Sequence, residues 1–85
     1  MTPAGIISEA LTIIDACGLD RTQLKVATGP RGAIIRRGRK PSGVHATLTR
    51  RGVTWYVTGE GVLWKGTSRH AAATQIANII EVGWR

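Results

Sequence analysis

The residues best suited to a chemical role are the cations gathered between Gly29 and Gly43. This stretch, GPRGAIIRRGRKPSG, holds four glycines and two prolines, a composition typical of a loop between strands. Its basic side chains are Arg31, Arg36, Arg37, Arg39 and Lys40. Guanidinium groups form forked hydrogen bonds with phosphate oxygens, and such charges are not buried without partners. We therefore expect a flexible basic loop over 29–43 that binds an anion.

Charge is distributed unevenly along the chain. Of the 12 Lys and Arg residues, nine lie between residues 21 and 59, where the sequence has no acid; the remainder sums to 3 − 5 = −2, and the whole chain to +7. Segregation of this kind favours a polyanion as the partner. We expect non-enzymatic, largely sequence-independent binding to DNA or RNA, with a duplex favoured. An acidic host protein would also attract these cations, so a small phage or mobile-element effector is the alternative function.

Residues able to catalyse a reaction are few. The two histidines, one cysteine and five scattered acids have no spacing that predicts a zinc site, paired carboxylates or a catalytic triad. We therefore expect no catalytic residue, metal or cofactor. His45 is the one candidate base, because it begins a predicted strand beside the basic loop. Here Ser42-Gly43-Val44-His45 loosely resembles the glycine-serine-histidine signature of the RNA-cleaving toxins of the HicA type, and an RNase is the less favoured alternative.

Two amphipathic segments at the ends of the chain predict helices. The first begins at Thr2 and Pro3 and ends at Gly18, each residue being typical of its position. Apolar residues recur along it at helical spacing: Ile6, Ile7, Ala10, Leu11, Ile13, Ile14 and Cys17. The second helix begins at Thr67 or Ser68 and runs to Glu81. Its apolar face comprises Ala72, Ile76, Ile79 and Ile80.

Residues 22–28, 45–50, 53–58 and 62–65 alternate between apolar and polar side chains and predict strands. Arg51 and Gly52 are expected to join the second to the third in a hairpin turn, and a further turn lies at 59–61. The apolar residues 33–35 could pair with an edge strand, which the pattern leaves open. The strand residues expected in the core are Ala46, Leu48, Val53, Trp55 and Val57. Cys17 is expected to pack as a small hydrophobe.

These elements predict one domain over 1–85 of the α+β class. An antiparallel sheet of three to four strands packs against the N-terminal and the C-terminal helix. No apolar run reaches the roughly 20 residues that span a bilayer, and the N-terminus lacks the features of a signal peptide. With a single cysteine, the sequence favours a cytoplasmic protein without a membrane partner. An edge strand could also pair with a second copy to form a homodimer.

The predicted order of elements resembles the double-stranded RNA-binding domain. The segment Gly66–Ala73 is similar to the opening of that family's second helix, with Ser68 as the hydroxyl residue and Arg69 and His70 as the basic pair. Gly29-Pro30 falls in the first loop between strands, where the family also carries a Gly-Pro pair. The resemblance implies an α-β-β-β-α fold in which Arg69 and His70 meet phosphates.

The basic loop carries a second resemblance. Its segment Arg37-Gly38-Arg39-Lys40-Pro41 is similar to the core of an AT-hook, which implies an extended arm in the minor groove of A·T-rich DNA. Tyr56 beside the Arg50-Arg51 turn could stack on bases, or form a cross-strand pair with a threonine. The residues expected to bind nucleic acid are Arg31, Arg36, Arg37, Arg39, Lys40, Arg50, Arg51, Arg69 and His70.

Overall fold

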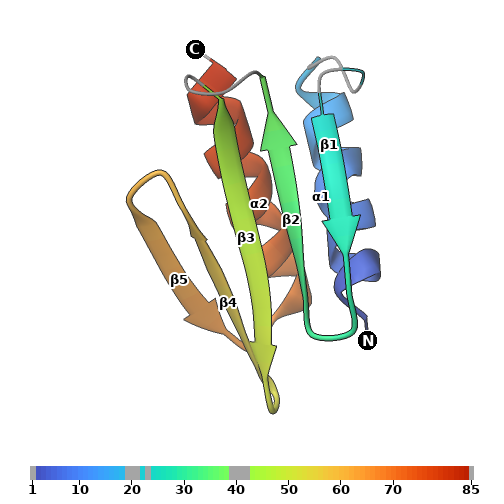
Figure 1. Cartoon of the computed structure of the whole chain (residues 1–85), viewed down its shortest axis with the longest axis vertical. Coiled ribbons are helices and arrows are strands. Elements are labelled where there is room, and N and C mark those ends of the chain that lie inside the picture. The colour runs from blue at the N-terminus through green and yellow to red at the C-terminus, as the bar shows by residue number, and fades with distance from the viewer. Residues whose placement is uncertain (1, 19–21, 23, 39–42, 85) are drawn as a thin grey trace.

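The computed structural model describes residues 2–18, 22, 24–38 and 43–84, which form two helices and five strands. Figure 1 shows the elements in chain order. They are α1 (Pro3–Ala16), β1 (Leu24–Thr28), β2 (Gly32–Arg37), β3 (Val44–Arg51), β4 (Thr54–Gly59), β5 (Val62–Gly66) and α2 (Arg69–Trp84).

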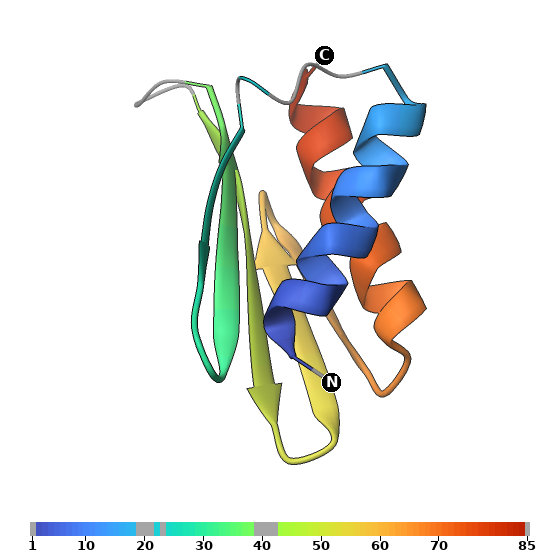
Figure 2. The ribbon, with the colours of Figure 1, turned by 90° about the vertical axis from the view of Figure 1, so that its right-hand side faces the viewer.

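The strands form one sheet in the order β1-β2-β3-β4-β5, and every neighbouring pair is antiparallel. Both helices lie on the same face of this sheet, and they run side by side in the same direction (Figure 2). The predicted α+β class with two terminal helices is therefore confirmed. The sheet has five strands, whereas the sequence predicted three to four.

The additional strand, β2, lies within the stretch that was expected to be a loop. Residues 29–43 are not a loop throughout, because Gly32–Arg37 pairs with β1 on one side and β3 on the other. Ala33 and Ile35 are buried under the helices, so burial of these two side chains stabilises the strand despite its neighbouring arginines. The two apolar residues thus belong to an interior strand of the sheet.

Each helix begins at a hydroxyl residue. The Thr2 side chain accepts a hydrogen bond from the Gly5 backbone N–H at 3.3 Å, with Pro3 in the first turn. Ser68, rather than Thr67, caps α2: its Oγ accepts a hydrogen bond from the Ala71 backbone N–H at 3.2 Å. These caps satisfy donors that the first helical turn cannot pair internally.

Tight turns set the register of the last three strands. Arg51 pairs with Thr54, so the β3–β4 turn consists of Gly52 and Val53 and lies one residue later than expected. Gly52 has a φ of 60°, which suits the first position of such a hairpin. In the β4–β5 turn Glu60 and Gly61 both have positive φ, 47° and 79°, as a type I′ turn requires.

One apolar core lies between the sheet and the helices. Its buried residues are Ile6, Ile7, Ala10, Ile14, Ala33, Ile35, Val44, Ala46, Leu48, Trp55, Val57, Ala72, Ala73, Ile76, Ala77, Ile79 and Ile80. Two expectations were wrong. Val53 is 75% exposed because it occupies the β3–β4 turn, and Cys17 is exposed where the chain leaves α1. The Cys17 thiol lies 3.5 Å from a Glu81 carboxylate oxygen of α2.

The helices do not cover the whole sheet. Val26 of β1 lies on the same face as the buried Ile35, yet it is 43% exposed, because β1 stands away from the helices and packs little against them. No helix within the described part of the chain is long and apolar enough to cross a membrane.

Candidate functional site

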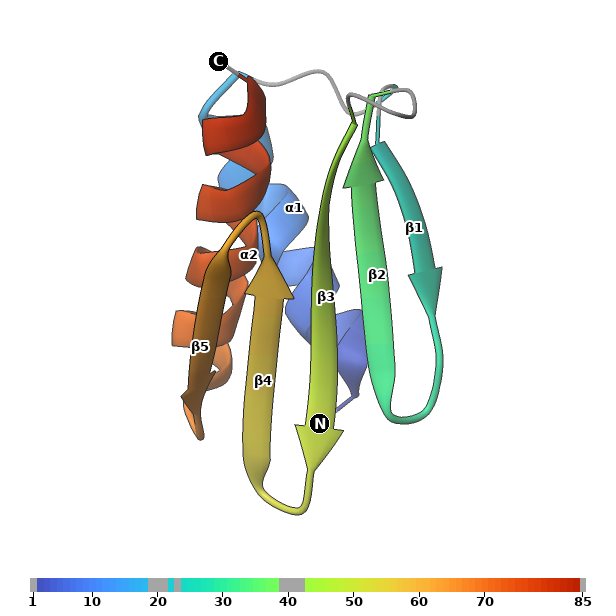
Figure 3. The same cartoon turned by 60° about the vertical axis from the view of Figure 1, so that its left-hand side comes forward.

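The sheet has one face that neither of the described helices covers, and Figure 3 shows it with all five strands in view. Side chains alternate between the faces of a strand, so the pairing registers identify the residues on this open face. They are Lys25, Ala27, Gly32, Ile34, Arg36, His45, Thr47, Thr49, Arg51, Thr54, Tyr56, Thr58, Leu63 and Lys65. None of them is buried, and no acid lies among them.

Three basic residues form a row at one end of the open face. Lys25 pairs with Arg36, and Arg36 pairs with His45, so their side chains follow one another across β1, β2 and β3. Directly opposed residues on adjacent strands have Cβ atoms about 4.5–5.5 Å apart, a distance at which like charges destabilise the sheet. Within the described part of the chain, neither Lys25 nor Arg36 has an ion-pair partner. This row is therefore a local concentration of positive charge that no acid among the described residues neutralises.

Tyr56 lies in a second row, nearer the other end of the face. It pairs with Thr49 on β3 and with Lys65 on β5, and its side chain is partly exposed. The register therefore places a threonine directly across from Tyr56, as one of the two alternatives for this residue supposed. Tyr56 is the one aromatic residue among the outward-facing positions of the five described strands. Beyond this row, Arg51 adds another exposed cation at the end of β3.

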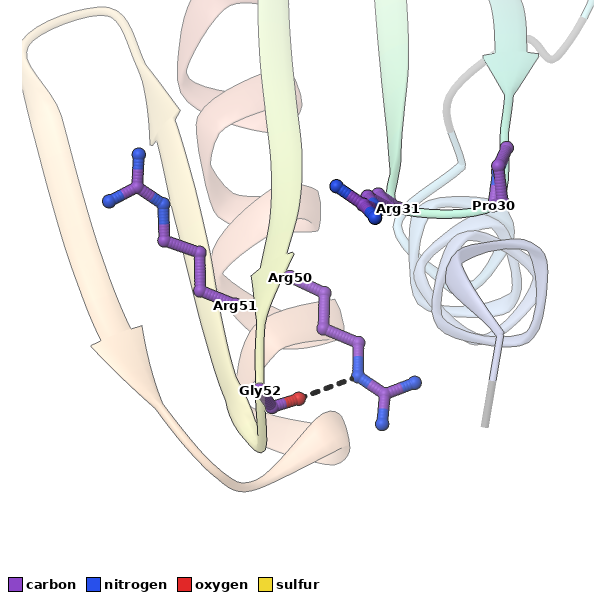
Figure 4. A pocket seen from close by; sticks show the side chains of 5 residues that line it. All are labelled: Pro30, Arg31, Arg50, Arg51 and Gly52. Atoms are coloured by element: carbon purple, nitrogen blue, oxygen red, sulfur yellow. Dashed lines mark hydrogen bonds between the residues drawn. The ribbon is translucent and has the colours of Figure 1, made fainter.

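The turns at this end bring together three of the expected arginines. Pro30, Arg31, Arg50, Arg51 and Gly52 line an open pocket (Figure 4). The Arg50 backbone N–H donates to the Arg31 carbonyl at 2.9 Å, which holds the β1–β2 loop against β3. The side chains of Arg50 and Arg51 leave the strand in opposite directions, so the guanidinium groups do not converge on one point (Figure 4).

Arg50 is held on the helix side of the sheet. Its Nε donates a hydrogen bond to the Gly52 carbonyl at 2.9 Å, and its guanidinium carbon lies 5.5 Å from the centre of the Trp55 ring. A cation over an aromatic face is attracted by the ring electrons. These contacts fix the Arg50 side chain against the core, away from the open face.

Arg37 also lies on the helix side, opposite Leu24 and Val44. Partial burial lowers the pKa of Arg37 below its ordinary value, because desolvation disfavours the charged form. Arg36 and Arg37 were both expected to bind nucleic acid, but consecutive strand residues face opposite ways. Only Arg36 of this pair lies on the open face.

Arg69 and His70 lie in the first turn of α2, on the helical layer. The His70 Nδ1 atom is 2.8 Å from a Glu9 carboxylate oxygen of α1, so this ring already has an anionic partner. Arg69 is exposed, and α2, which begins with it, starts at the same end of the molecule as the β1–β2 loop (Figure 1). The two residues are therefore separate from the open face.

The structure thus divides the expected binding residues. Arg36 and Arg51 lie on the open face, Arg31 lies in a loop at its edge, and the others that can be placed belong to the helix side or to α2. Arg39 and Lys40 lie outside the described residues. Lys25 and Lys65, which the structure places on the open face, were not among the predicted binding residues. Alternation already placed Lys25 opposite to Leu24, but the strand register was needed to place it beside Arg36.

His45, the one candidate base, lies in the basic row of the open face. It is exposed on the open face, and the described residues opposite and beyond it in its row are Arg36 and Lys25, which are both cations. In the described part of the chain, no group of three or more His, Cys, Asp and Glu residues has an arrangement that could hold a metal ion. The arrangement around His45 is therefore one that can bind an anion.

Comparison with known proteins adds no relative: no family model matches the chain, and no curated protein and no solved structure is significantly similar to it.

Proposed function

We propose that this chain is a non-enzymatic nucleic-acid-binding protein that contacts phosphates through the open face of its sheet. The observation that carries the proposal is the composition of this face: it displays Lys25, Arg36, Arg51 and Lys65 and, among the described residues, no acid. Phosphate contacts of this kind give affinity with little sequence preference. Arg31 extends the basic surface at the end where the turns lie, and Arg69 is a further cation at the start of α2, off the open face.

The pairing of Lys25 with Arg36 supports a ligand at this face. Opposed like charges cost stability, and the strands offer no acid to offset that cost. A phosphate between the two side chains would convert the repulsion into two charge-assisted contacts. Binding of an anion would therefore remove the repulsion between Lys25 and Arg36 and stabilise the folded protein.

The distribution of the cations favours a repeating anion over a single carboxylate. Lys25 lies on one edge strand, Lys65 on the other, and Arg36 and Arg51 between them. A nucleic acid backbone presents phosphates at regular intervals and can meet cations spread across the whole face. A host protein with a large acidic surface is the competing partner.

The test measures binding of the full chain to fluorescently labelled oligonucleotides by anisotropy over a salt series. If about five phosphates are contacted, the logarithm of affinity should fall against that of salt with a slope of about −4.5 on duplex DNA, or about −3.5 on a single strand. The triple variant Lys25→Gln, Arg36→Gln, Lys65→Gln should bind more weakly and with a shallower slope.

A matched control distinguishes the effect of cations on the open face from the effect of the total net charge. The variant Ala4→Glu, Thr12→Glu, Asn78→Glu also lowers the charge of +7 by three, but its changes lie at exposed positions on the helices. It should retain most of the affinity that the sheet variant loses. Equal losses in both variants, or an affinity that does not change with salt, would contradict the proposal. Absence of any binding, with a nuclease-resistant protein partner recovered from lysate, would favour the effector function.

A further inference from the structure

The open face has a centre whose composition differs from its basic rows. Threonines occupy four positions on β3 and β4, and Tyr56 lies among them with Thr49 on one side and Lys65 on the other. Ile34, 41% exposed, and Leu63, 75% exposed, lie in the neighbouring row. Binding of phosphates does not require an aromatic ring or apolar side chains at the centre of the face.

The dimensions of the face disfavour a duplex as its ligand. Five strands about 4.8 Å apart span roughly 19 Å between the outer strands. The major groove of B-DNA is about 12 Å wide and admits a helix or a two-stranded ribbon, so this sheet cannot enter it face-on. A duplex lying across the face would touch it through phosphates and leave the centre without contacts.

The helical layer offers no better route into a groove. Its charges include Glu9 and Asp15 on α1 and Glu81 on α2, so this layer carries acidic residues, whereas the open face carries none. Like charges at a binding surface repel the partner. The described residues therefore favour contact through the sheet.

We infer that the open face binds single-stranded nucleic acid, with a base stacked on the Tyr56 ring and phosphates on the basic rows. The inference rests on the proposed function and names its ligand. The rows of Tyr56 and Arg36 are four residues apart along β3, from Thr49 to His45, which corresponds to about 13 Å. A stacked strand that rises about 3.4 Å per nucleotide covers this distance with about four nucleotides.

The test compares three ligands of equal length by anisotropy: a labelled 12-nucleotide oligothymidylate, a 12-base-pair duplex, and a 12-unit abasic strand that keeps the phosphates without bases. Oligouridylate as a fourth ligand distinguishes RNA from DNA. The protein should bind both single strands more tightly than the duplex or the abasic strand. Tyr56→Leu should weaken binding to the single strands by roughly 5- to 150-fold, the range seen for base–aromatic stacking.

The same substitution should leave binding of the abasic strand unchanged, and circular dichroism checks that the variant is folded. Tyr56→Trp should restore single-strand binding, because it returns a ring on which a base can stack. Tighter binding of the duplex, or Tyr56→Leu without effect on any ligand, would overturn the inference and leave the proposed function standing. If none of the ligands binds, the proposed function itself fails.

Discussion

Two consecutive isoleucines show that residue type alone does not decide whether a side chain of this sheet is buried. Ile35 is fully buried beneath the helices, whereas Ile34 lies on the open face and is 41% exposed. Both belong to β2, and they differ only in the direction in which the strand points them. Apolar area stabilises a fold when it is removed from water, so the two should contribute unequally.

We predict that Ile35→Ala lowers the free energy of unfolding by about 2–5 kcal/mol, because it leaves a cavity in the core. Ile34→Ala removes the same atoms from a partly exposed position and should cost less than about 1 kcal/mol. Urea unfolding followed by circular dichroism measures both. Equal losses would show that the open face is covered by another surface in solution.

At the scale of elements, β2 is the strand that converts a basic segment into part of a sheet. It begins at Gly32, where the chain passes close to β3. A Cβ atom at this position would lie 2.5 Å from the Leu48 carbonyl oxygen, closer than real Cβ contacts allow. Glycine is therefore required for the two strands to approach as they do.

Gly32→Ala should therefore destabilise the protein by about 1–3 kcal/mol, since the backbone of β3 has to move away. Gly29→Ala is the matched control, because the nearest atom to a Cβ at Gly29 is the Gly32 carbonyl oxygen at 3.9 Å. That variant should change stability by less than about 0.5 kcal/mol. Thermal unfolding of both proteins tests the pair, and a neutral Gly32→Ala would contradict the close approach of β2 and β3.

The elements with strong local signals in the sequence were predicted correctly. The strand whose formation depends on pairing with distant strands was not. Both helices and the Glu60-Gly61 turn were predictable, because caps, helical spacing and positive-φ residues act locally. β2 was not, since its consecutive isoleucines and arginines interrupt the alternation of a half-buried strand.

The sequence predicted that the candidate site would have an excess of positive charge. It did not predict which of the charged residues lie on the same surface. Nine cations without an acid over residues 21–59 are visible in the sequence. Which of them share a face depends on strand register, which places Lys25 beside Arg36 and sends Arg37 and Arg50 to the helix side. A loop was expected to carry the site, whereas the structure offers the face of a sheet.

At the scale of the whole molecule, the charge of +7 is spread over a body with a radius of gyration of 11.6 Å. Repulsion among these cations opposes the compact state, and salt screens it, with a Debye length of about 10 Å at 0.1 M. Stability should therefore depend on ionic strength even without a ligand.

We predict that raising sodium chloride from 10 to 150 mM increases the unfolding temperature by about 2–6 °C, which corresponds to somewhat less than 1 kcal/mol for a domain of this size. The triple variant Lys25→Gln, Arg36→Gln, Lys65→Gln should show a smaller increase, because the opposed pair on β1 and β2 has been removed. Differential scanning calorimetry measures both. An unfolding temperature that falls over this range would show that attractive ion pairs dominate.

The parallel direction of the two helices gives the molecule polarity. Their amino ends, which carry partial positive charge, lie at the same end of the molecule as the β1–β2 loop and the β3–β4 turn, where Arg31 and Arg51 are found (Figures 1 and 4). Asp15 and Glu81 lie in the last turns, so their charges add to the helix dipoles. The electric field of an anionic polymer should orient this dipole as the protein approaches. The turns that carry the arginines should then meet the polymer first, and the face of the sheet should bind it afterwards.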